Sequence, residues 1–315
     1  MFFPWARGDG SRIEFQSQMT NIQHISRFPS SSASGQQTSF AGPGAGPGAR
    51  TGVLLLHGLG GSPAELYPLT CELRSAGYEV SAPTIDGLAC GTDMESTFSW
   101  QDWLANAEAH YDALAEKCGT IHVCGFCGGA LLASLLSVSR QKSFGELVMI
   151  SPTFNGDGWA VPLRFMAYKL VTQRWLARLF TFHEREPFGL KDERIRGVVL
   201  RMLERTHKPE EHIFDISGVK MMEFNRLARN VKKMLSEVTA RTLVVHARED
   251  DVSSLGNAER VVRKINGPTE MQVVADCYHV ILLDRHRTVA INAVLRFLSA
   301  AQQRLANSVT ERRAG

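Results

Sequence analysis

The sequence lacks the features that mark several large classes of protein. No stretch approaches the roughly 18 consecutive apolar residues that a membrane-spanning helix needs. The N-terminal MFFPWA run is too short for a secretory signal and has no basic region before it. Lys and Arg (35) barely exceed Asp and Glu (32), whereas nucleic-acid-binding chains usually show a denser basic excess. We therefore expect a cytoplasmic globular protein that has no transmembrane segment and binds no nucleic acid.

Cysteine is also sparse, with six residues in a chain of 315. That density is far below the density of a disulfide-stapled secreted scaffold, so the cysteines are interpreted as free thiols. No spacing of His and Cys indicates a metal site, and the glycine patterns of phosphate-binding and dinucleotide-binding loops are missing. We expect neither a metal nor a cofactor.

The composition divides the chain into a leader, an α/β core, a lid inserted into that core, and a C-terminal tail. Residues 1–50 are dominated by Ser, Gly, Pro and Gln, and they predict a flexible leader because they cannot bury enough apolar surface. Residues 51–152 and 236–306 alternate short continuous apolar runs with longer runs at helical spacing, which indicates an α/β core with a mostly parallel, doubly wound sheet. Buried strands are expected at residues 53–56, 78–82, 121–124, 147–150, 242–245 and 271–274.

Local signals place the helices of this core. A helix is expected over residues 63–76, closed by Gly77, and another begins at Ser99, which Asp102 completes as a capping box. Further helices are expected at residues 128–138 and 288–305, followed by a C-terminal tail at 307–315.

The alternation of strands and helices breaks between residues 153 and 235, which we interpret as a helical lid with amphipathic runs at 163–180 and 195–204. This segment holds sixteen Lys and Arg against ten Asp and Glu. The excess is consistent with attraction of coenzyme A or an acyl carrier protein, but an ordinary solvated helix face is the favoured interpretation. Trp159 and Met166 belong to an apolar stripe that either packs on the body or binds substrate.

The segment HVCGFCGGALLASLL places Cys127 between a buried strand and a helix, with Gly125 and Gly129 on either side. A nucleophile on a sharp strand-to-helix turn needs glycines two residues before and two after, because side chains there would clash. The helix N-terminus also brings partial positive charge to the sulfur and favours the thiolate. The alternative is a small buried cysteine in a tightly packed turn.

A second glycine-rich turn, HGLGG, follows the first expected strand. Its N–H at Leu59, together with the N–H of Gly128, is expected to form an oxyanion hole facing the nucleophile. A simple strand-to-helix connection is the alternative. We expect His57 to be a structural hydrogen-bonding residue rather than a base.

The acid and the base are expected after the last two strands, in HAREDDVS and DCYHV. Both segments then lie at the carboxyl edge of the sheet, where Cys127 also lies. We expect His279 to take the proton from Cys127 and Asp250 to orient the imidazole and stabilise its charged form. Asp251 is the rival acid, with a salt bridge or a helix cap as its structural alternative, and a surface loop is the alternative for His279.

These stretches together resemble the α/β-hydrolase superfamily over about residues 52–304, and more closely its small lidded carboxylesterases and monoacylglycerol-lipase-like members. The matching segments are LLLHGLGGSPAEL, AGYEVSAPTIDGL, VCGFCGGALLA, VVHAREDD and YHVILLD. Cys127 stands where most of those esterases have serine, a feature that instead resembles dienelactone hydrolases and polyhydroxyalkanoate synthases.

The resemblance implies attack on an ester or thioester carbonyl and a covalent acyl-enzyme, with a small-molecule acyl ester or thioester as substrate. Acyl transfer to an acceptor other than water is the second expectation, because a thiol exchanges readily with a thioester. A fold kept only for binding is the third. The spacing of Cys124 and Cys127 also permits a regulatory disulfide, although Cys124 is expected to point into the sheet packing.

Overall fold

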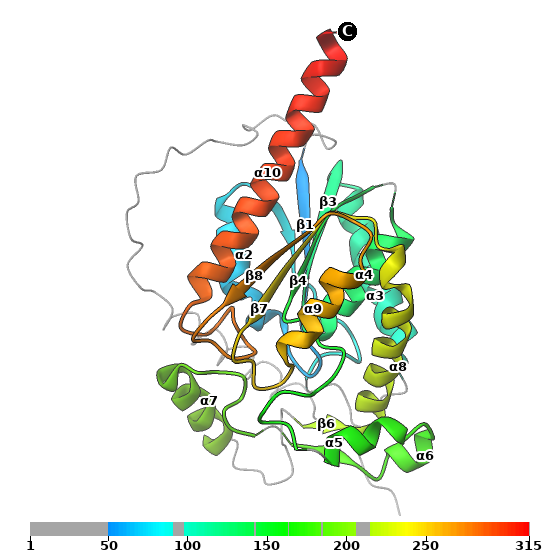
Figure 1. The fold of residues 1–315 in the computed structure, drawn as a ribbon, viewed down its shortest axis with the longest axis vertical. Coiled ribbons are helices and arrows are strands. Elements are labelled where there is room, and N and C mark those ends of the chain that lie inside the picture. The colour runs from blue at the N-terminus through cyan, green and yellow to red at the C-terminus, as the bar shows by residue number, and fades with distance from the viewer. Residues whose placement is uncertain are drawn as a thin grey trace, which may run out of the picture. The chain divides into compact units, whose positions relative to one another are not determined.

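The computed structural model describes residues 50–90, 98–141, 143–162, 164–183, 185–205 and 215–314. The expected leader therefore lies outside the described residues except for Arg50. Six strands of this part of the chain form one parallel sheet in the order β2-β1-β3-β4-β7-β8 (Figure 1). They are β1 (Thr51–Leu56), β2 (Glu79–Ser81), β3 (Thr120–Phe126), β4 (Phe144–Ile150), β7 (Thr242–Ala247) and β8 (Thr269–Val274).

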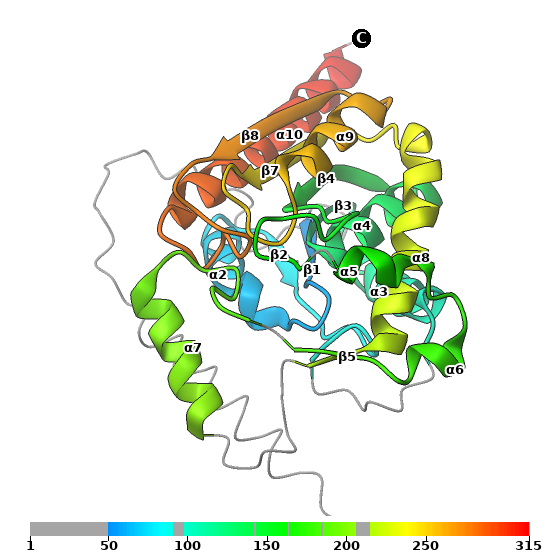
Figure 2. The ribbon, with the colours of Figure 1, turned by 60° about the horizontal axis from the view of Figure 1, so that its bottom comes forward.

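Helices cover both faces of the sheet because the strands are apolar on both sides. In β1, Val53 and Leu55 pack in one core cluster, and Leu54 and Leu56 pack in the other. Figures 1 and 2 show α2 (Tyr67–Ser75) and α10 (Arg287–Ala314) on one face. The opposite face carries α3 (Trp100–Ala115), α4 (Gly128–Ser139), α8 (Gly218–Met234) and α9 (Leu255–Lys264). The predicted α/β class with a parallel, doubly wound sheet is confirmed.

Two of the predicted helices differ from the observed ones at their ends. The capping box of α3 is confirmed, with the Ser99 N–H donating to Asp102 Oδ2 at 2.7 Å. The helix expected over 63–76 begins as the short 3₁₀ helix η2 (Pro63–Leu66) before α2. Helix α10 runs to Ala314, past the expected end at 305 and through the segment expected as a tail, because residues rich in Ala, Gln, Arg and Glu favour continuation.

The segment between β4 and β7, called the insert below, contains mostly short elements. They are α5 (Arg164–Ala167), η3 (Tyr168–Leu170), α6 (Arg174–Ala177), β5 (Thr181–Phe182), α7 (Glu193–Arg205), β6 (Ile216–Ser217), α8 and η4 (Leu235–Glu237). The single helical run expected at 163–180 is wrong: Val171 is extended, at φ −75° and ψ 108°, and separates η3 from α6. Helix α8 joins the main core through Phe224, Leu227 and Val231.

The insert elements α5, α6 and β6 lie beyond the carboxyl ends of the strands (Figure 1). Parallel sheets bind ligands at that edge. Within the described residues, no helix is both long enough and apolar enough to cross a membrane.

Candidate active site

Cys127 lies on the turn between β3 and α4, in a backbone conformation that side chains rarely adopt. Its φ is 51° and its ψ is −113°, and it caps the N-terminus of α4. The backbone around it leaves no room for further side chains. A Cβ at Gly125 would lie 2.2 Å from the Gly129 carbonyl oxygen, and a Cβ at Gly129 would lie 2.3 Å from the Leu56 carbonyl oxygen. The sequence G-x-C-x-G therefore occurs here because the turn requires both glycines.

The HGLGG turn lies directly against the turn that carries Cys127. A Cβ at Gly58 would come within 3.2 Å of Cys127 Cβ, and one at Gly128 would come within 3.3 Å of the Leu59 nitrogen. The structure thus brings the backbone nitrogens of Leu59 and Gly128 to the same place. The turn is braced by Glu65, whose Oε2 accepts the Gly58 N–H at 3.2 Å.

His57 is fully buried, and its imidazole contacts the backbone of the same turn. Its Nδ1 lies 2.9 Å from the Gly58 carbonyl, and its Nε2 accepts the Ile85 N–H at 3.0 Å. These two contacts fix the neutral tautomer with the proton on Nδ1. Burial lowers the pKa of His57 to about 4, so the imidazole stays neutral near pH 7. The interpretation of His57 as a structural residue agrees with this geometry.

His279 and Asp250 meet in the loops that follow β8 and β7. His279 Nδ1 is 2.8 Å from Asp250 Oδ2, and the other carboxylate oxygen of Asp250 accepts the N–H groups of Val252 and Ser253 at 2.9 and 2.7 Å. His279 Nε2 is buried, and no residue in the described part of the chain forms a hydrogen bond with it. The imidazole is therefore oriented from one side and open on the other, with its ring 5.2 Å from that of Phe126, the residue before Cys127.

The surroundings of His279 favour its charged form. Burial opposes the imidazolium, but the charges of Asp250 and Cys127 outweigh it and hold the pKa of His279 well above its usual range. The pKa of Asp250 is held below its usual range despite burial, chiefly by the charge and hydrogen bond of His279. Asp250 thus carries the negative charge that an imidazolium at 279 needs.

The rival acid, Asp251, contacts the same loop in a different way. Its Oδ1 accepts the backbone N–H of His279 at 3.1 Å, and its Oδ2 accepts the N–H of Gly189 in the insert at 3.1 Å. It makes no hydrogen bond to the imidazole. Burial raises the pKa of Asp251. Asp251 therefore joins the loop that carries His279, called the histidine loop below, to the insert through hydrogen bonds.

Asp284 makes a second tie of this kind, which the sequence gave no reason to expect. Its fully buried carboxylate accepts the backbone N–H groups of Tyr278 and Arg285 at 2.7 and 2.9 Å. From the insert it accepts those of Lys191 and Asp192 at 3.0 and 2.8 Å. One carboxylate therefore joins the insert at residues 191 and 192 to the chain around Tyr278 and Arg285, and these segments are distant in sequence.

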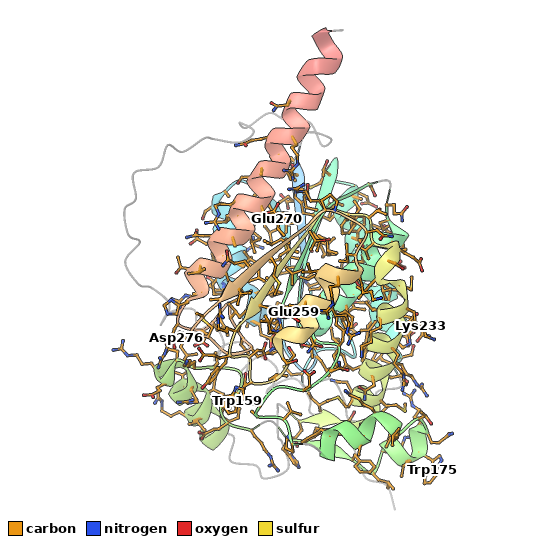
Figure 3. All side chains as sticks on the ribbon, viewed as in Figure 1. Trp159, Trp175, Lys233, Glu259, Glu270 and Asp276 are labelled. Atoms are coloured by element: carbon orange, nitrogen blue, oxygen red, sulfur yellow. The ribbon has the colours of Figure 1, made fainter. Side chains whose placement is uncertain are left out.

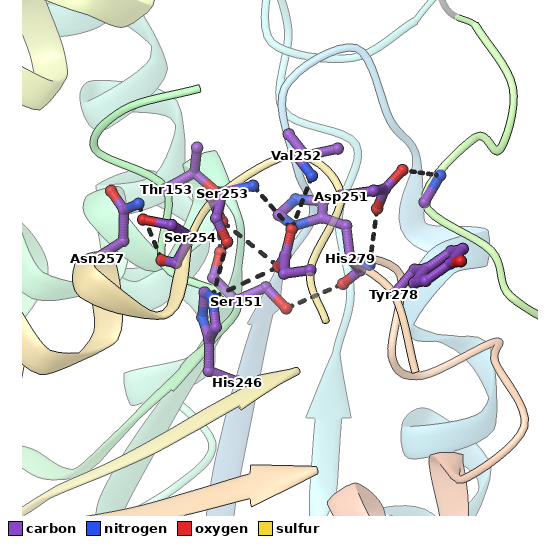
Figure 4. Close-up of polar contacts among 12 residues, drawn as sticks. Ser151, Thr153, His246, Asp251, Val252, Ser253, Ser254, Asn257, Tyr278 and His279 are labelled. Carbon is purple, nitrogen blue, oxygen red and sulfur yellow. Dashed lines mark hydrogen bonds and ion pairs between the residues drawn. The ribbon is translucent and has the colours of Figure 1, made fainter. Parts of the chain in front are cut away.

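Further residues around Cys127, His279 and Asp250 were also missed by sequence reasoning. Ser151, at φ 45°, donates from Oγ to the His279 carbonyl at 2.9 Å. His246, buried behind Asp250, has its Nε2 3.0 Å from the Ser253 carbonyl and 3.5 Å from Asp250 Oδ2 (Figure 4). His246 stands in the quoted segment HAREDDVS, and its place at the end of a buried strand was the available signal.

Apolar side chains from the insert lie close to the HGLGG turn and to the turn that carries Cys127. The ring of Phe224 on α8 lies 3.3 Å from the position of a Cβ on Gly128, and Ile216 of β6 lies 3.0 Å from that of Gly60. These two residues wall the space above Leu59 and Gly128. Trp159 is instead 63% exposed, with its Nε1 donating to the Glu249 carbonyl at 3.1 Å.

Trp159 also packs edge-on against Tyr278, beside the histidine loop, and Figure 3 labels it there. Met166 belongs to α5, and its side chain lies outside the described residues. The substrate-binding role of both residues stays a prediction. A pocket of about 380 Å³ lies within the insert, between Phe165, Tyr168 and Phe182, and Cys127 and His279 are not part of its lining.

All six cysteines are free thiols. Cys124 is fully buried in the core cluster on the α2 and α10 face, and burial raises its pKa. Cys127 is partly exposed at the elbow. The two thiols of the C-x-x-C spacing thus occupy different environments. No group of three or more His, Cys, Asp or Glu suited to a metal occurs among the described residues.

Comparison with known proteins adds four findings. Residues 53–291 match the model of the alpha/beta hydrolase family. A thermostable monoacylglycerol lipase from Bacillus sp. (strain H-257) is 28% identical over 253 residues, which are 79% of this chain and 90% of the relative. The structure of a soluble variant of monoglyceride lipase from Saccharomyces cerevisiae aligns with a TM-score of 0.67 at 14% identity, covering 82% of this chain and 88% of that one. The monoacylglycerol lipase of Paleococcus ferrophilus gives a TM-score of 0.63 at 18% identity, covering 79% and 94%.

The Asp250→Asn variant tests the electrostatic part of the site. Removing the carboxylate charge should lower the pKa of His279, measured by NMR titration of its imidazole. The raised pKa stabilises the fold fully below the unfolded value of about 6.5, and this contribution is lost as pH rises through the folded value. The variant should therefore lose more stability at pH 6 than at pH 10. An unchanged His279 titration would contradict the assignment.

The Asp284→Asn variant tests the tie between the histidine loop and the insert. An amide offers one acceptor oxygen where the carboxylate offers two, so buried N–H groups lose their partners. We expect the free energy of unfolding to fall by about 3 kcal/mol in urea titrations. The matched control is Asp276→Asn, a 46% exposed acid eight residues earlier that pairs with Lys191 and Arg285. That control should change stability by less than about 1 kcal/mol. Equal effects would show that Asp284 has no special role.

Proposed function

Because the chain belongs to the alpha/beta hydrolase family, we propose that it hydrolyses ester or thioester bonds of small molecules through Cys127, His279 and Asp250. The observation that carries the proposal is the relation of Cys127 to His279. The thiol stands at φ 51° on a helix N-terminus, and the imidazole beside it is oriented by Asp250 and has an open Nε2. His57, which we interpret as structural, instead has contacts at both ring nitrogens.

The reactive state is the pair in which the Cys127 thiol has passed its proton to His279 Nε2, because the charge of Asp250 favours the imidazolium. The sulfur attacks the carbonyl carbon, and the carbonyl oxygen becomes an oxyanion that accepts hydrogen bonds from the N–H groups of Leu59 and Gly128. The intermediate collapses, and the alcohol or thiol leaves with the proton from His279. Water then attacks the acyl-enzyme thioester, with His279 accepting its proton, and the carboxylic acid is released as Cys127 is regenerated.

The thiol decides which acyl compounds react best. A sulfur nucleophile is larger than oxygen, so the tetrahedral intermediate is displaced relative to the N–H donors, and each weakened oxyanion contact slows the reaction. Thiol attack on a thioester is nearly balanced in energy, which favours thioesters over ordinary esters. The relatives named as monoacylglycerol lipases support a substrate with an apolar acyl chain, and Phe224 and Ile216 beside the elbow fit such a chain.

The first experiment is mass spectrometry of the intact protein after mixing with short and medium acyl thioesters. We expect an acyl adduct on the wild type and none on Cys127→Ala. The matched control is Cys71→Ala, which removes another partly exposed thiol, on α2, and should leave the adduct unchanged. An adduct that persists in Cys127→Ala would contradict the proposal, and so would the absence of both adduct and thioester consumption.

The lifetime of the adduct separates the two acyl reactions. Decay in water alone indicates a hydrolase, whereas a stable adduct released by an added alcohol or amine indicates an acyltransferase. A protein that forms no adduct and consumes no thioester would instead fit a binding role.

The Cys127→Ser variant tests the effect of sulfur. The shorter bond to oxygen should return the intermediate to the N–H donors of Leu59 and Gly128. We expect the ratio of kcat/KM for an ester to that for the matching thioester to rise by about tenfold or more. Parallel assays with one acyl chain on both leaving groups measure this ratio. A ratio that falls would argue against the oxyanion assignment.

A further inference from the structure

The ammonium groups of two lysines both contact one side-chain amide oxygen, and this cluster is separate from Cys127 and His279. Asn155 Oδ1 lies 3.1 Å from Lys169 Nζ and 2.8 Å from Lys232 Nζ. The three residues come from the loop after β4, from η3 and from α8. Arg229, one helical turn before Lys232, reaches the Lys169 carbonyl with Nη1 at 3.4 Å. Like charges are brought together here, which is unfavourable unless an anion offsets them.

Arg260 of α9 adds a fourth cation. Burial lowers the pKa of Lys232, and the charges of Lys169, Arg260 and Arg229 lower it further, while Asp157 opposes them. The Nε of Arg260 is buried, and none of the residues that the structure describes forms a hydrogen bond with it. Among the described residues, these four cations have no carboxylate oxygen within 4 Å, which leaves their charge without a direct ion pair.

The nearest acid does not supply the missing partner. Asp157 Oδ1 accepts the Ser254 N–H and the Asn257 side-chain amide, both at 2.9 Å, and the residue is exposed. Its charge is therefore committed to the N-terminal end of α9. The cations keep N–H donors that Asn155 cannot satisfy, because one amide oxygen has two lone pairs and already accepts from both lysines.

We propose that Lys169, Arg229, Lys232 and Arg260 form a binding site for phosphoryl groups, called the phosphate site below. A phosphate or diphosphate carries several negative charges and at least three acceptor oxygens, which match two ammonium groups and two planar guanidinium groups. A single carboxylate would neutralise too little of this charge. The ligand is thus a phosphate-bearing small molecule.

The loop that carries Asn155 is held by hydrogen bonds and continues back to Ser151, which contacts the His279 backbone. Asn257 Oδ1 accepts the N–H groups of Phe154 and Asn155 at 3.0 Å each, and Ser151 in the same loop holds the His279 carbonyl. Ser151 and Asn155 are four residues apart, so their Cα atoms are at most about 14 Å apart. The phosphate site can therefore take its phosphate from two sources. One is a free phosphate compound, and the other is the phosphate end of an acyl donor such as a coenzyme A thioester.

Calorimetry with inorganic diphosphate, at constant ionic strength set by chloride, tests the site without any turnover. The wild type should bind, and Lys232→Gln should weaken binding by about tenfold or more because one charge-assisted hydrogen bond is lost. Asn155→Asp, which places a carboxylate between the two lysines, should weaken it at least as much. The matched control is Lys233→Gln, the next residue of α8, which is exposed and labelled on the outer side of that helix in Figure 3. It should leave the affinity unchanged.

Two results would overturn the phosphate site: no diphosphate binding by the wild type, or an equal loss of affinity in Lys232→Gln and Lys233→Gln, which would indicate only general attraction to positive charge. A folding defect is detected independently by thermal unfolding in the absence of anions. There Lys232→Gln should unfold at the same temperature as the wild type or higher, since like-charge repulsion is relieved. A lower temperature would show that the lysines stabilise the fold and would also count against the site.

The source of the phosphate is decided in the Cys127→Ala protein, which cannot form the proposed adduct. Tighter binding of a coenzyme A thioester than of diphosphate or of the matching phosphate-free pantetheine thioester supports an acyl donor. Equal affinity for the coenzyme A thioester and diphosphate supports a free phosphate compound. Both results keep the site, and both are independent of whether Cys127 reacts in the wild type.

Discussion

The positive φ of Cys127 is the constraint on which the rest of the site depends. A side chain in this conformation stores roughly 1–3 kcal/mol of strain, and it persists because β3, α4 and the HGLGG turn leave the backbone no alternative. Gly125 and Gly129 allow the three segments to approach within contact of one another. The same close approach brings the HGLGG turn against Cys127 and Gly128, so the strain and this contact have one cause.

His279 is positioned by carboxylates rather than by apolar packing alone. Asp250 orients the imidazole, Asp251 holds the backbone of His279, and Asp284 joins the histidine loop to residues 191 and 192. Each acid accepts hydrogen bonds from segments that are far apart in the chain. The position of His279 and the position of the insert are therefore linked, and a change in one is felt by the other.

Local patterns made the fold and the candidate nucleophile predictable. The buried strands, the capping box of Ser99 and the glycines around Cys127 each act within a few residues, and their chemistry can be read from the sequence. Asp284 and Asn155 could not be predicted in this way, because each has a partner far away in the chain, Lys191 for Asp284 and Lys232 for Asn155. The run expected as one helix at 163–180 was broken by Val171, whose extended conformation depends on packing within the insert. The place of Asp250 followed from loop spacing, whereas the contacts of Asp251 needed the structure.

The way β4 pairs with β7 has a consequence for how such a chain diversifies. Met149 and Val244 are register partners in the sheet although the whole insert separates them in sequence. The entropy of closing a loop rises slowly with its length, by about 0.6 kcal/mol for each doubling. Segments before α8 can thus be lengthened, shortened or exchanged between relatives at little thermodynamic penalty, provided that the hydrogen bonds to Asp251 and Asp284 are kept. Natural or laboratory evolution can therefore vary substrate range through this segment while the sheet and its reactive turn stay unchanged.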